Sequence, residues 1–243
     1  MLNFNCRKVY HARSAQRLIH PNRSVTMNAS SQDKTTSRAL IWLVILWAIG
    51  LLWSGWKPHD RITWVLEVFP CFIALAFMWP TRKSFELTAL VYWLIAVHGL
   101  ILMLGGAYTY AHVPLGFWMQ DWFGFTRNNY DKIGHFAQGF VPAMVVRELL
   151  IRKFAITRRG LVAFLCIAIC LGFSAFYELI EWWSALIMGQ GADEFLGTQG
   201  DPWDTQSDMF FALIGASCAM LFLPNWHDRQ LNLIASASRP TSS

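Results

Sequence analysis

Residues 127–136 read Arg127-Asn128-Asn129-Tyr130-Asp131-Lys132-Ile133-Gly134-His135-Phe136, and they run from a polar segment straight into an apolar one. Asp131 and His135 are four positions apart, so in a helix they lie on the same face, one turn from each other. A carboxylate and an imidazole therefore enter an apolar layer together. Ionisable side chains within a membrane are costly and usually mark a functional site. The stretch predicts a helix that begins at a polar site on one side of a membrane.

The composition places the chain among membrane proteins. Of its 243 residues, 55% are hydrophobic and 14% are charged, against roughly 25% charged in a typical soluble domain. The 13 Trp and 18 Phe suit contact with lipid and with the membrane interface. The Lys and Arg residues form no basic block of the kind that binds nucleic acid. We expect the lipid bilayer, and not a nucleic acid, to be the partner of this chain.

Six apolar segments are long enough to cross a hydrocarbon core of about 30 Å as helices. The sequence predicts an all-α bundle of six transmembrane helices within residues 39–225. A basic, disordered cytoplasmic tail (1–38) precedes the bundle and a short cytoplasmic tail (226–243) follows it. The expected helices are Ala39–Trp56, Ile62–Trp79, Glu86–Gly106, Asp131–Ile151, Leu161–Ile187 and Asp201–Leu223, with Asp201 as the N-cap of the last.

The distribution of Lys and Arg predicts the orientation. With both termini in the cytoplasm, 16 of these residues lie inside and 4 outside, and cytoplasmic loops carry such an excess. The chain is therefore expected to cross the membrane several times with both termini inside. In this orientation, ionisable residues from five of the six helices gather at the periplasmic side: Glu67, His98, Asp131, His135, Glu178, Glu181, Asp204 and Asp208.

The polar cluster allows three interpretations. Imidazole and carboxylates are ligands that zinc, manganese and iron accept, so the leading hypothesis is a divalent metal site. Such a site activates water, as in a hydrolase or transferase acting on a lipid-associated substrate. The alternatives are a transporter coupled to protons or cations, and a non-catalytic role. In the non-catalytic role, Arg127 or Lys132 pairs with carboxylates to tie the helices together, and the aromatic connection between residues 107 and 130 binds a partner or lipid. The predicted metal ligands are His135, Glu178, Asp204 and Asp208, and the predicted catalytic residues are His135, Glu178, Asp208, Glu181 and Asp131.

Other residues carry less chemistry at the level of sequence. His98 stands alone on an apolar helix, which is typical of a hydrogen-bonded packing residue. Asp193 and Glu194 lie in a Gly-rich connection and are expected to form a polar loop. The sequence contains no GxSxG, P-loop, GxGxxG or HExxH motif, so the common hydrolase, nucleotide and zinc-protease signatures are excluded.

Several motifs resemble those of a known family. They are Gly-Ala-Tyr-Thr-Tyr (106–110), the stretch 127–136, Arg147-Glu148, Phe-Tyr-Glu-Leu-Ile-Glu-Trp (176–182) and Leu-Gly-Thr-Gln-Gly-Asp-Pro-Trp-Asp-Thr-Gln-Ser-Asp-Met (196–209). Over roughly residues 39–225 the chain resembles the YjdF-like bacterial inner-membrane proteins. This resemblance implies a helical fold and a location in the bacterial inner membrane, and it implies no reaction. The order Asp-Lys-x-x-His-Phe, a helix ending in Glu and an Asp opening the last helix also resembles VanZ-like membrane proteins, which are associated with glycopeptide resistance.

Overall fold

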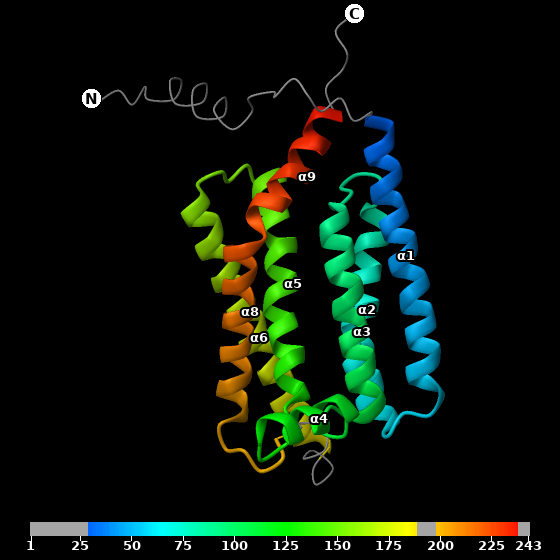
Figure 1. Ribbon diagram of the computed structural model, residues 1–243, viewed down its shortest axis with the longest axis vertical. Helices are drawn as coiled ribbons and strands as arrows, with labels where there is room; N and C mark the ends of the chain where they lie inside the picture. The colour runs from blue at the N-terminus through cyan, green and yellow to red at the C-terminus, as the bar shows by residue number, and fades with distance from the viewer. Residues whose placement is uncertain (1–28, 189–197, 238–243) are drawn as a thin grey trace, which may run out of the picture.

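The computed structural model describes residues 29–188 and 198–237, and within these ranges the chain forms helices and turns without any strand. The long helices run side by side, and the short α4 lies across one end of the bundle (Figure 1). The helices are α1 (Ala29–Trp56), α2 (Arg61–Thr81), α3 (Ala89–Tyr108), α4 (Pro114–Phe123), α5 (Tyr130–Arg152), α6 (Arg159–Met188), α8 (Asp204–Phe222) and α9 (Pro224–Ala237).

The predicted all-α membrane architecture is confirmed, and five of the six predicted membrane helices have the length and hydropathy of a membrane span. Five helices in the described ranges are long and apolar enough to cross a membrane, namely α1, α2, α3, α6 and α8. The remaining long helix in the bundle, α5, has 23 residues. Its hydropathy is too low for it to count as a membrane-spanning helix, because it has charged residues in its first turn and near its C-terminal end. These residues are Asp131, Lys132, Arg147, Glu148 and Arg152.

The outer surface of the bundle is apolar. Large hydrophobic side chains point away from the other helices, as in Leu52, Phe77 and Leu221, whose exposed fractions are 76%, 71% and 73%. A soluble domain seldom leaves such extensive apolar surface uncovered. This apolar surface is suited to contact with lipid, because lipid acyl chains form no hydrogen bonds.

Helix α5 lies at the centre of the bundle, against α3, α6 and α8. Its approach to α8 is close because glycines lie where the two backbones meet. A Cβ atom on Gly139 would lie 1.8 Å from the carbonyl oxygen of Ala212, and one on Gly215 would lie 2.0 Å from that of Phe136. Small residues at helix crossings allow this backbone contact. The contact fixes how the polar starts of α5 and α8 face each other.

The opposite end of α5 holds a saturated polar network. Glu148 is fully buried and accepts hydrogen bonds from the backbone and hydroxyl of Thr88 and from Nε2 of His227, at 2.9–3.1 Å. Arg147 contacts Nδ1 of His227 at 2.8 Å and pairs with Asp228 at 2.6 Å. His227 thereby donates through one ring nitrogen and accepts through the other. The network ties α9 to α3 and α5.

The structure corrects both predicted tails. Residues 29–38 are helical and belong to α1, and residues 1–28 lie outside the described ranges. Residues 224–237 form α9 in place of a polar tail, because His227 and Leu231, one turn apart, are buried against the bundle. That helical spacing was present in the sequence. The predicted polar loop with Asp193 and Glu194 also lies outside the described ranges.

The predicted start of the last bundle helix is wrong by three residues. Helix α8 begins at Asp204, and its N-cap, Trp203, makes no side-chain capping bond. Asp201 instead accepts a hydrogen bond from the backbone of Trp203 at 2.9 Å. Aspartate commonly bonds the backbone two residues on and so forms a turn before a helix. By contrast, Asp60 does cap α2, and the hydrogen bond from the backbone of Thr63 holds the pKa of Asp60 below its usual value.

Candidate functional site

The candidate site lies where α5 and α8 begin and α6 approaches its end. This is the end of the bundle that carries α4, opposite the start of α1 and the end of α9 (Figure 1). Asp131 and His135 occupy consecutive turns of α5, Glu178 and Glu181 lie on α6, and Asp208 lies on α8. The prediction that these residues gather at one end of the bundle is confirmed.

Two cations join the starts of α5 and α8. Nζ of Lys132 lies 2.6 Å from Asp204 and 2.8 Å from Asp208, and it lies 3.4 Å from Asp131. Arg127 pairs with Asp131 and, at 2.6 Å, with Asp204. Lys132 and the three carboxylates around it, Asp131, Asp204 and Asp208, are all buried. The pairing of Arg127 and Lys132 with carboxylates, which the non-catalytic interpretation required, is therefore present.

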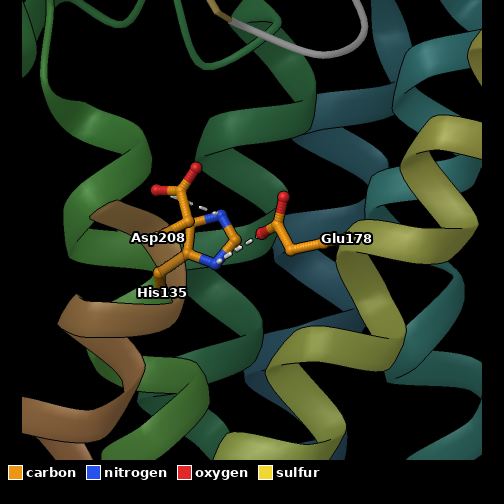
Figure 2. Close-up of side chains that lie close together, drawn as sticks. All are labelled: His135, Glu178 and Asp208. Carbon is orange, nitrogen blue, oxygen red and sulfur yellow. Dashed lines mark ion pairs between the residues drawn. The ribbon is translucent and has the colours of Figure 1, made fainter. Parts of the chain in front are cut away.

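His135 lies between the carboxylates of Glu178 and Asp208, as Figure 2 shows. Its Nδ1 is 3.8 Å from Oε1 of Glu178, and its Nε2 is 3.6 Å from Oδ1 of Asp208. Nδ1 also contacts the side-chain oxygen of Gln138 at 2.9 Å. Oε1 of Glu178 is buried and has no hydrogen-bond partner among the described residues. A buried carboxylate oxygen without a partner is costly, so this atom calls for a ligand or a proton.

The spacing of these three groups fits a metal ion. One ligand atom from each of His135, Glu178 and Asp208 lies within 4.8 Å of the other two. Ligands about 2.1 Å from a tetrahedral zinc ion lie about 3.4 Å from one another, so only small movements are needed. Asp208 also accepts the hydrogen bond from Lys132. That bond fixes the carboxylate in place, as hydrogen bonds to metal-binding side chains commonly do.

A cavity of about 210 Å³ adjoins this site between α2, α3, α5, α6 and α8. His98 borders it, and its Nε2 atom is buried without a partner among the described residues. One ring nitrogen of the predicted hydrogen-bonded packing residue His98 therefore lacks a partner among the described residues. The cavity is lined by Glu67, Pro70, His98, Leu102, Tyr110, Asp131, Gly134, His135, Gln138, Pro142, Tyr177, Glu181 and Asp208.

The structure separates the predicted site residues into two groups. Asp131, His135, Glu181 and Asp208 border the cavity, and Glu178 lies beside it against His135. Asp204 lies instead between Lys132 and Arg127. Four titratable cavity residues were not among the predicted catalytic or metal-binding residues, namely Glu67, His98, Tyr110 and Tyr177. The sequence did indicate Glu67 as unusual, because a carboxylate interrupts an apolar helix there. It did not distinguish the two tyrosines from the many other aromatic residues.

The buried acids outnumber the cations beside them. Six carboxylates at this end of the bundle are at least nine-tenths buried, and apart from His135 only Arg127 and Lys132 form ion pairs with any of them among the described residues. A buried excess of negative charge must be met by protons or by bound cations. The six are Glu67, Asp131, Glu178, Glu181, Asp204 and Asp208.

The fold and this site together define a class of protein: a multi-pass helical membrane protein with a buried histidine and carboxylate cluster at one end of its bundle. The chain belongs to the family described as "Predicted membrane protein (DUF2238)", whose model matches residues 39–229. It is 55% identical over 181 residues to the inner membrane protein YjdF of Escherichia coli K12, covering 74% of this chain and 87% of that protein. No solved structure matches the chain. The predicted YjdF-like family and inner-membrane location are thus confirmed.

Proposed function

We propose that His135, Glu178 and Asp208 bind one divalent metal ion, such as zinc, manganese or iron. The observation that carries this proposal is the unpartnered, buried Oε1 of Glu178 beside an imidazole and a second carboxylate. A buried carboxylate oxygen without a hydrogen-bond partner is stabilised by a bound cation. Histidine and carboxylate side chains are ligands that these metals accept. Asp204 is left out of the ligand set because its Oδ1 is held by both Lys132 and Arg127 and because it forms no ion pair with His135, as Asp208 does.

The proposed activity is hydrolysis or group transfer on a lipid-associated substrate. The metal ion would supply an activated water or polarise the bond under attack. Asp131 and Glu181 border the cavity beside the ligands and are the proposed acid and base groups. Lys132 holds Asp208 in place through its hydrogen bond. The apolar outer surface supports a substrate that arrives through the bilayer.

The proposed topology has six crossings, with α5 as the sixth and both termini in the cytoplasm. Helix α5 is surrounded by α3, α6 and α8, so its charged residues lie against protein and away from lipid. The start of α1 and the end of α9 lie at the same end of the bundle (Figure 1). Together with the positive charges counted above, this arrangement supports a site that opens to the periplasm.

Metal analysis of the purified protein tests the metal site. Inductively coupled plasma mass spectrometry would be run on wild type and on His135→Ala, with the exposed His59→Ala as the matched control. We expect about one equivalent of metal in wild type and in the control, and its loss in His135→Ala, because an aliphatic side chain leaves two carboxylates as ligands. Equal metal in all three proteins would contradict the site.

Absence of metal from all three proteins would favour a second function, transport coupled to protons. The observation behind it is the pair of prolines within α2 and α5, Pro70 and Pro142, which both border the cavity. A proline inside a helix removes a backbone hydrogen bond and kinks the helix, so it marks a point where halves of the helix can move. In that function the buried acids exchange protons in place of holding a metal.

A further inference from the structure

We infer that the cavity is a binding site for a primary ammonium group, whether on a free amine or on the amine head group of a lipid. The site consists of Glu67, Glu181, His98, Tyr110 and Tyr177, and we call it the amine cavity. It goes beyond the proposed metal site, because none of these residues is a proposed metal ligand and Glu181 is the one residue that it shares with the proposed acid and base groups. The inference depends on charge balance, on hydrogen-bond acceptors and on the shape of the walls.

Two buried carboxylates in the amine cavity have no cation of their own. Glu67 comes from α2 and Glu181 from α6, with exposed fractions of 5% and 8%. Neither takes part in any ion pair of the described ranges, whereas Asp131, Asp204 and Asp208 all do. Both border the same cavity. A primary ammonium group between them would offset one of the two negative charges, and a proton on the other carboxyl would offset the second.

The third acceptor is His98. His98 borders the same cavity, and its Nε2 is buried and has no partner among the described residues. A primary ammonium group has three N–H donors and no acceptor. Two carboxylates and one imidazole nitrogen match that number. A quaternary ammonium has no N–H to offer, so it would leave all three acceptors without a hydrogen bond.

Tyrosines form part of the wall, and one of them is held by an unusual turn. Thr109 and Tyr110 both have positive φ, 56° and 49°, a conformation that non-glycine residues seldom adopt. The turn directs the Tyr110 ring against Gly105 and Gly134, where added Cβ atoms would lie 2.3 and 2.9 Å from it. An aromatic face beside carboxylates is a favourable surface for an ammonium group.

The size of the amine cavity also favours a molecule over an ion. Its volume is about 210 Å³, and a water molecule in the liquid takes about 30 Å³. A metal ion held beside it by His135 would leave most of this space empty. Leu102 and Pro70 add apolar wall, which suits the first carbons of an alkylamine.

Calorimetric titration with hexylammonium chloride tests the inference. The protein would be purified in a neutral detergent and treated with a chelator, so that binding is measured without the metal ion and the two proposals fail independently. Hexanol is the control ligand because it has the same chain and no charge. We expect hexylammonium to bind at least about tenfold more tightly than hexanol, since each 1.4 kcal/mol gives a factor of ten.

Variants locate the site. Glu67→Gln and Glu181→Gln keep the side-chain shape and remove one charge, and each should weaken hexylammonium binding at least about tenfold. Asp121→Asn, on the exposed surface of α4, is the matched control and should bind as wild type does. If one glutamine variant does not purify as a monodisperse protein, the affinity of the other variant for hexylammonium still tests the inference. Equal affinity for hexanol, or unchanged affinity in the glutamine variants, would overturn the inference.

The source of the ammonium group is found by competition. Hexylammonium affinity would be compared in nanodiscs of phosphatidylcholine with and without phosphatidylethanolamine. Weaker apparent affinity with phosphatidylethanolamine identifies a lipid head group as the ligand, because that lipid carries a primary ammonium and phosphatidylcholine does not. Equal affinity in the two membranes identifies a free amine. Both results support an amine cavity.

Discussion

At the scale of single residues, Lys132 is the side chain on which the starts of α5 and α8 depend. It is buried and lies within 2.8 Å of both Asp204 and Asp208. Removing one partner of a buried ion pair leaves an uncompensated charge, which costs far more than the pair itself contributes. Arg127 also pairs with Asp204, so Asp208 is the carboxylate most affected by loss of Lys132.

We predict that Lys132→Met lowers the stability of the purified protein by about 3–5 kcal/mol. Thermal unfolding in detergent measures this change. Lys153→Met, at an exposed position just after α5, is the control and should have little effect. The double variant Lys132→Met/Asp208→Asn should recover part of the loss, because it removes the unpaired charge. Equal unfolding temperatures for Lys132→Met and the control would contradict the role given to Lys132.

At the scale of elements, the packing of α5 on α8 sets the geometry of the site. Gly139 and Gly215 lie at backbone contacts between the two helices, and the polar residues that open each helix lie two to three turns before these glycines. A side chain at either contact would push the helices apart. The ion pairs of Lys132 across the two helices would then lengthen.

We predict that Gly139→Ala destabilises the protein by about 1–3 kcal/mol, as overpacking of a tight contact usually does. Gly172→Ala is the matched control, because an added Cβ on that α6 residue meets nothing within 4 Å. Thermal unfolding of both variants in the same detergent compares them. A Gly139→Ala protein as stable as the control would show that the helices can separate at no cost.

At the scale of the whole molecule, the two ends of the bundle differ in how their polar groups are satisfied. At the end near α9, Glu148 has its full set of partners from Thr88, His227 and Arg152. At the other end, Glu178 and His98 each have a buried atom without a partner among the described residues. Saturated networks stabilise a fold, and unsatisfied buried groups indicate a site that takes a ligand.

We predict that the unsatisfied end faces the periplasm, and cysteine labelling tests this orientation. Single cysteines would replace Asp121 on α4 or Arg158 between α5 and α6, both exposed, in a protein without the five native cysteines. A membrane-impermeant maleimide added to intact cells should label the cysteine at position 121. The cysteine at position 158 should react only after the membrane is broken. The reverse pattern would contradict the orientation.

The sequence alone determined the class of protein, most helix positions and the end of the bundle where the ionisable residues gather. These properties follow from local hydrophobicity and spacing, which a single chain displays directly. It predicted His135, Glu178 and Asp208 as neighbours because each lies at the same depth of its helix. It did not predict α9, whose inward face is one histidine and a few apolar residues in a polar segment.

Only the tertiary structure decided how the site residues divide. Asp204 and Asp208 lie one turn apart, yet Asp204 lies between Lys132 and Arg127 while Asp208 also reaches His135. The cavity likewise depends on a left-handed turn at Tyr110 and on residues from α2 and α3. These outcomes depend on the rotation of each helix about its axis, and contacts such as those of Gly139 and Gly215 set that rotation. Hydrophobic pattern gives the depth of a residue, whereas packing gives its partner.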